Sequence, residues 1–146
     1  MISILDVADS VIHQWFIVYR DRPGYFWFTH LQKRGFRHVE AWREFRYGPQ
    51  VNDVMWIIVN PQFEMLDVVI DANPIPPWIR DPRCTVQNVT AARKCKRVRD
   101  WCQLGPASCV EYVKALLGIG IDALFVRTPW QLYKYIAKRN CSIISR

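Results

Sequence analysis

The chain has 146 residues, of which 51% are hydrophobic and 14% aromatic, and its formal net charge is +7. This length suits one compact domain with a substantial core, and the aromatic content argues against disorder. No apolar run approaches the roughly 20 residues of a membrane-spanning helix, and the first residues lack the pattern of a signal peptide. Five cysteines form neither zinc-type pairs nor an even disulfide set, which predicts free thiols in a soluble intracellular protein.

The first half of the chain reads mainly as strands. Residues 6–15 have the spacing of a short helix, residues 16–19 suit a strand, and a Pro-Gly turn separates them from a strand at 25–31. Residues 36–45 alternate strictly between two faces, and β-branched or aromatic runs follow at 55–59 and 65–70. These patterns predict an antiparallel meander or small barrel.

The second half begins with a proline-rich connector at 71–82 and continues with residues 86–101, whose composition suits a helix. A helix is expected from Cys109 to about Leu117, ended by Gly118, followed by a short strand at 121–127. Thr128 and Pro129 then predict the start of a helix over 130–138. We therefore expect an α+β fold in a single domain, residues 1–146. Its parts are an N-terminal segment (1–24), a strand meander (25–71), a connector with a basic segment (72–104), and the cysteine helix, strand and C-terminal helix (105–146).

Cys109 is the leading candidate for a nucleophile. Ser108 and Glu111 match the capping box S-x-x-E, which predicts that the helix begins at Cys109. The free N–H groups and the dipole at that end favour negative charge, so we expect a thiolate to form there more easily than on a free cysteine. The same N–H groups can bind an oxyanion. The alternative is a small core residue, because the chain has four other cysteines.

A nucleophilic thiol needs an imidazole base and a partner that orients the imidazole. Of the three histidines, His38 lies in the alternating strand, whereas His13 suits a structural role and His30 is a reserve base. If the hairpin folds around residues 49 and 50, position 38 falls opposite about position 60 or 61, so Asn60 is a candidate neighbour of His38. A slip of one residue would put the two side chains on opposite faces.

Two further residues are alternative orienters of His38. Glu40 lies on the same strand face as His38, and Gln62 follows Asn60 by two positions. Asn60 also precedes a proline, so a role as the cap of its strand stays open.

The combination of Cys109 at a helix start with His38 and Asn60 on neighbouring strands resembles the Cys, His, Asn set of papain-like enzymes. Because His precedes Cys, the order is similar to that of the circularly permuted papain-like group, which includes bacterial amidases and lecithin–retinol acyltransferase. Gln103 stands six residues before Cys109, the spacing of the papain-type oxyanion-hole glutamine. The sequence departs from the papain pattern at Val110, where an aromatic residue is common. Residues 25–138 also resemble small uncharacterised proteins of tailed bacteriophages.

The resemblance implies a papain-like thiol hydrolase or acyltransferase of the peptidase or amidase type, acting on a peptide, amide or ester. Cys109 would be the nucleophile, His38 the base and Asn60 its orienter. Gln103 and the Cys109 backbone N–H would form the oxyanion hole. This chemistry requires no cofactor and no metal, and we expect neither.

Two other functions fit the sequence. A phage virion structural or interaction protein with an inactive papain-like fold would bind other virion proteins, and would be found in the virion or the host cytoplasm. A nucleic-acid-binding protein would use the basic C-terminus and the basic segment 93–99. The cationic residues of that segment are Arg93, Lys94, Lys96, Arg97 and Arg99. The sequence leaves the substrate and the oligomeric state open.

Overall fold

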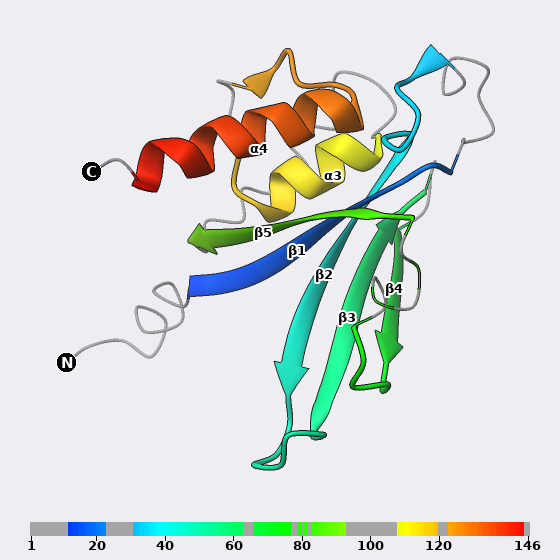
Figure 1. The fold of residues 1–146 in the computed structure, drawn as a ribbon, viewed down its shortest axis with the longest axis vertical. Helices are drawn as coiled ribbons and strands as arrows, with labels where there is room; N and C mark the ends of the chain where they lie inside the picture. Colours follow the sequence, from blue (N-terminus) through cyan, green and yellow to red (C-terminus); the bar gives the residue numbers. More distant parts are fainter. Residues whose placement is uncertain are drawn as a thin grey trace.

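The described residues fold into one antiparallel sheet with two helices on one of its faces (Figure 1). The computed structural model describes residues 12–22, 31–62, 66–76, 79, 81, 83–92, 108–119 and 123–144. The strands are β1 (Ile12–Arg20), β2 (His38–Arg46), β3 (Val54–Pro61), β4 (Leu66–Asp71) and β5 (Thr85–Ala92). The helices are α3 (Cys109–Leu116) and α4 (Pro129–Ile144). The expected α+β class is therefore confirmed.

The expected meander is present as β2, β3 and β4, which are neighbours in a sheet of order β4-β3-β2-β1-β5. The β2–β3 hairpin closes through the Tyr47 N–H, which donates to the Asp53 carbonyl, and through the Asp53 carboxylate, which accepts from the Gln50 N–H. The expectation of a small barrel is wrong, because β4 and β5 lie at opposite edges and the sheet is not closed.

Three other predicted elements differ from the structure. The helix expected over 6–15 is replaced, from Ile12 on, by β1, which pairs with both β2 and β5. The helix expected over 86–101 is the strand β5 up to Ala92, and residues 93–107 lie outside the described part of the chain. The strand expected over 121–127 is, in its described residues 123–127, a turn closed by the Val126 N–H on the Ala123 carbonyl. Residues 25–30 of the expected strand 25–31 lie outside the described part of the chain.

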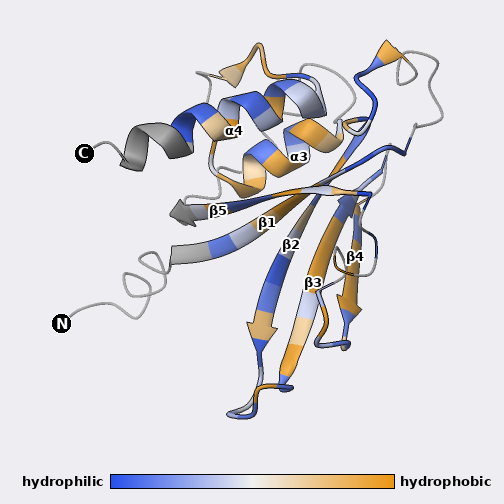
Figure 2. Ribbon diagram, in the orientation of Figure 1, coloured by the Kyte–Doolittle hydropathy of each residue, from blue (hydrophilic) through white to orange (hydrophobic). Residues whose placement is uncertain are grey.

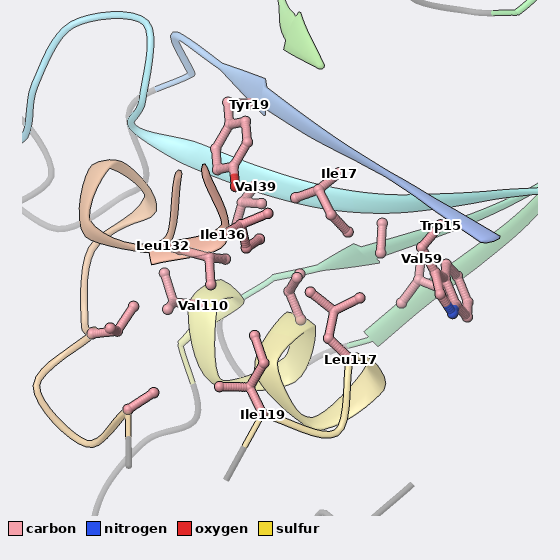
Figure 3. Packing of buried hydrophobic residues seen from close by; sticks show 14 residues of the cluster. Trp15, Ile17, Tyr19, Val39, Val59, Val110, Leu117, Ile119, Leu132 and Ile136 are labelled. Atoms are coloured by element: carbon pink, nitrogen blue, oxygen red, sulfur yellow. The ribbon is translucent and has the colours of Figure 1, made fainter. Parts of the chain in front are cut away.

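The main core lies between the sheet and the two helices (Figure 3). Alternate residues of β1 and β2 point into it, among them Ile17, Tyr19 and Val39, and they meet Val110 of α3 and Leu132 of α4. A second buried cluster lies on the opposite face of the sheet, around Val18, Trp42, Val54 and Trp56. The alternation of β2 therefore sends odd-numbered side chains toward the helices and even-numbered ones, His38 included, toward the other face.

Both helices begin where the sequence predicts. The Ser108 hydroxyl accepts from the Glu111 N–H at 3.3 Å, and Gly118 adopts a φ of 64° just after α3. The Thr128 hydroxyl accepts from the Gln131 N–H at 3.3 Å, with Pro129 as the first residue of α4. In the described residues, neither helix is long and apolar enough to cross a membrane.

Candidate active site

The side chains of His38 and Asn60 form a hydrogen bond. The Nε2 atom of His38 lies 2.8 Å from Oδ1 of Asn60, and the pair is partly buried. The β2–β3 ladder pairs Ala41 with Val59, so the same register continued by one position sets Glu40 opposite Asn60. His38 and Asn60 are thus diagonal neighbours on one face, because Asn60 lies opposite Glu40, two residues along β2 from His38.

This hydrogen bond determines which ring nitrogen of His38 is free to act as a base. A carbonyl oxygen such as Oδ1 of Asn60 only accepts, so Nε2 of His38 carries the proton and donates it. In the neutral imidazole, Nδ1 then has the free lone pair. Burial lowers the pKa of His38, while the hydrogen bond to Asn60 opposes that shift. A neutral imidazole at neutral pH is the form that a general base requires.

Cys109 is the first residue of α3, and the start of this helix lies beside the start of β2 (Figure 1). Three backbone N–H groups, those of Val39, Val110 and Cys109 itself, stabilise negative charge on the sulfur and so lower its pKa. The Val39 N–H belongs to the peptide group that links His38 to Val39. Cys109 and Val39 also belong to one hydrophobic cluster, so the start of α3 packs beside the residue that follows the candidate base.

The electrostatics of Cys109 differ from the sequence-based expectation. Burial is the largest effect and raises the pKa of the Cys109 thiol, and the three backbone N–H groups only partly offset it. The capping box is also incomplete. The Glu111 carboxylate does not reach back to the helix start but receives both its contacts, at 3.2 Å, from Nζ of the buried Lys114. Lys114 in turn donates to the Val126 carbonyl, which fixes α3 to the turn before α4.

The thiol and the imidazole lie on different sides of the sheet. Among the described residues, the side-chain partners of His38 are Asn60 and Glu40, and no hydrogen bond joins Cys109 to either ring nitrogen. The Cys109 side chain packs against the helix-side core, whereas the alternation of β2 turns His38 toward the other face at the strand's first residue. Because β2–β3 pairing begins only at Ala41, His38 extends beyond the ladder.

The two alternative orienters have other partners. The buried Glu40 accepts from Nε1 of Trp42 at 2.9 Å and pairs with Nε of Arg20 at 3.3 Å, while its other oxygen lies 3.8 Å from Nε2 of His38. Gln62 donates to Asp67 at 2.7 Å. Asn60 is thus the hydrogen-bond partner of His38, and Glu40 is a nearby negative charge that raises the pKa of His38.

Several candidates lie outside the described residues. They are His30, the proposed oxyanion residue Gln103, and all cations of the basic segment, Arg93, Lys94, Lys96, Arg97 and Arg99. Their roles stay predictions. Within the described ranges, no group of three or more His, Cys, Asp or Glu side chains is placed to hold a metal ion.

A polar cavity of about 720 Å³ next to His38 was not identified from the sequence. Its lining residues come from the ends of β1 and β2 and from the chain before β5: Arg20, Asp21, Arg22, Gly35, Glu40, Asp81 and Arg83. Glu40 connects the cavity to His38, as its carboxylate contacts both Arg20 and the imidazole. The lining comes from three separate parts of the chain, so no local sequence motif could have predicted the cavity.

Comparison of the chain with known protein families, curated proteins and solved structures gave no match.

Proposed function

We propose that the protein is a papain-like thiol hydrolase or acyltransferase in which Cys109 attacks an amide or ester carbonyl and His38 transfers the proton. The observation that carries this proposal is the 2.8 Å contact between Nε2 of His38 and Oδ1 of Asn60, which leaves Nδ1 as the base. The position of the Cys109 sulfur against the peptide group after His38, at the start of a capped helix, supports it. The permuted papain-like topology is part of the same proposal.

The reaction proceeds in two balanced steps. Nδ1 of His38 takes the proton from the Cys109 thiol as the sulfur bonds to the carbonyl carbon. The protonated imidazole returns this proton to the leaving amine or alcohol as its bond to carbon breaks, which leaves a thioester on Cys109. Water, or an acceptor alcohol or amine, then attacks the thioester while His38 again accepts and returns the proton. Because burial raises the pKa of the thiol, the sulfur is deprotonated during attack rather than beforehand.

The base and the nucleophile have to approach each other for this step. Hydrogen bonds of catalytic groups are often long without substrate and shorten when it binds. The proposal therefore requires the His38 ring or the start of α3 to move toward the other group when substrate binds.

Acylation by p-nitrophenyl acetate tests the proposal. We expect a burst of one p-nitrophenol per protein and an acetyl group on the Cys109 peptide in mass spectrometry. His38→Ala should slow the burst by about a hundredfold or more, the usual range for loss of a general base. Cys84→Ala is the matched control, because Cys84 is also a partly buried cysteine outside any disulfide, but its Sγ donates to the Asp81 carbonyl. Acetylation of Cys109 no faster than that of Cys84, or a burst unchanged in His38→Ala, would overturn the proposal.

One observation favours a second candidate function, that of a structural or interaction protein with the same fold. Edge strand β4 exposes Leu66, Val68 and Ile70 on one face, and Phe45 of β2 is exposed on the same side of the sheet. Figure 2 shows this hydrophobic colouring along β3 and β4, beyond the helices. Such an apolar surface is typical of a protein interface. Stoichiometric recovery of the protein in an assembled particle, with Cys109→Ala equally functional, would favour this role over catalysis.

A further inference from the structure

The cavity beside His38 has a charge pattern that selects its ligand. Three arginines and three carboxylates line it. Each carboxylate already has an arginine partner: Glu40 and Asp81 both contact Arg20, at 3.3 and 3.0 Å. Asp21 is held at 3.3 Å by Arg37, which stands outside the lining. The local set is therefore four arginines against three carboxylates.

The excess positive charge belongs to Arg22. Within the described part of the chain, Arg22 has no ion-pair partner, and its side chain is exposed at the cavity. Arg83 is bound only loosely, with Nε 3.5 Å from Asp81 and 91% of its side chain exposed. Both guanidinium groups can thus turn toward a ligand without breaking a buried contact.

We infer that this cavity binds a carboxylate group of the substrate, held by Arg22 and Arg83, so that the substrate is an acidic, peptide-like molecule rather than a lipid ester. The inference rests on the proposed function only in calling the ligand a substrate. One unpaired cation matches a monoanionic carboxylate, which guanidinium groups bind through paired hydrogen bonds. A long acyl chain would need apolar walls, and the cavity is lined by charged side chains and one glycine.

The bound carboxylate would also act on the base. Arg22 and Arg20 both lower the pKa of His38 by charge repulsion, which places their guanidinium groups within electrostatic range of the ring. An anion on Arg22 cancels part of this repulsion, so binding and protonation of His38 are linked. The site would therefore strengthen the base when an acidic substrate is present.

A binding experiment on the Cys109→Ala protein tests the inference without catalysis. The probes are N-acetyl-alanyl-alanine and its C-terminal amide, which differ only in the carboxylate. We expect the acid to bind at least about tenfold more tightly than the amide, because one charge-assisted hydrogen bond contributes about that difference in affinity. We also expect the acid, and not the amide, to raise the pKa of His38 in an NMR titration of its ring.

Substitutions locate the site. Arg22→Gln should reduce the affinity for the acid to that for the amide, and Arg46→Gln should leave it unchanged. Arg46 is a suitable control because it is an exposed arginine of β2 paired with Glu44, far along the strand from His38. Equal binding of acid and amide, tighter binding of inorganic phosphate, or no effect of Arg22→Gln would each overturn the inference.

The outcomes separate this inference from the proposed function. Binding of the acid at Arg22 in a protein whose Cys109 is never acetylated would overturn the proposed enzyme activity and support the carboxylate site. Acetylation of Cys109 in a protein that binds the acid and the amide equally well would support the enzyme activity and overturn the carboxylate site.

Discussion

At the scale of single residues, the pairing of His38 with Asn60 depends on the parity of the β2–β3 register. Paired positions such as Ala41 and Val59 sum to an even number, 100, so the side chains of two even-numbered residues share a face. If the turn were centred between residues 49 and 50, paired positions would sum to 99, and the side chains of His38 and Asn60 would lie on opposite faces of the sheet. The sequence predicts that the two residues are near each other, but a one-residue difference in the turn decides whether they touch.

Replacing Asn60 should alter both the pKa and the function of His38. In Asn60→Ala we expect the pKa of His38 to fall, because the hydrogen bond to Asn60 raises it in the native protein. The loss of ring orientation should slow acetylation of Cys109 by about a hundredfold, as small misplacements of catalytic groups do. NMR titration of His38 and the acetylation rate measure the two effects. Gln62→Ala is the control, since Gln62 bonds Asp67, and an equal effect of both variants would contradict the assigned role of Asn60.

At the scale of elements, helix starts were predictable and strand β5 was not. Ser108 and Thr128 each cap a helix through a hydrogen bond to the N–H three residues later, a contact that local sequence alone specifies. Residues 86–101 have a composition that suits a helix, but the chain up to Ala92 forms a strand because β1 offers it an edge from Ile12 to Tyr19. Within β5, Gln87 accepts from the Tyr19 hydroxyl and donates to the Tyr133 carbonyl, contacts that exist only in the assembled fold.

The two helix caps give a matched pair of variants. We expect Ser108→Ala and Thr128→Ala each to lower the free energy of unfolding by about 1 kcal/mol, because each leaves a backbone N–H of the first turn without its acceptor. Only Ser108→Ala should slow acetylation of Cys109, since only that cap sets the start of α3. Urea denaturation and the p-nitrophenol burst test this. Equal acetylation rates in the two variants, at equal stability, would show that the start of α3 does not position the thiol.

At the scale of the whole molecule, the sheet separates two environments at the candidate site. The helix-side core encloses the Cys109 side chain, whereas the other face holds His38, Glu40 and the arginine-lined cavity. The two sides are linked at the start of β2, where the Val39 N–H lowers the pKa of the Cys109 thiol. Each of these two side chains is buried on its own side of the sheet, and burial is the largest cause of the pKa shift of both His38 and Cys109.

Burial of His38 makes folding stability depend on pH. Its folded-state pKa lies below the ordinary value of 6.5, so above pH 6.5 the ring is neutral in both the folded and unfolded chains and contributes nothing. As the pH falls below 6.5, the unfolded chain binds the proton first, and the free energy of unfolding decreases until the folded-state pKa is reached.

We therefore expect His38→Gln to lose less stability than the native protein between neutral and mildly acidic pH. Urea denaturation at several pH values on both sides of 6.5 measures the difference. Parallel pH profiles for the two proteins would show that the imidazole is not held in its neutral form.

The sequence by itself determined the features that neighbouring residues specify: the starts of α3 and α4, the end of α3 at Gly118, and the alternating strands that became β2, β3 and β4. The tertiary structure alone decided that β5 pairs with β1, that the sheet stays open, and that His38 contacts Asn60. It also reversed the expected direction for the Cys109 thiol, whose pKa burial raises. The physical reason is range: capping bonds and alternation act within a few residues, whereas register, burial and a cavity built from three parts of the chain arise only when distant segments pack together.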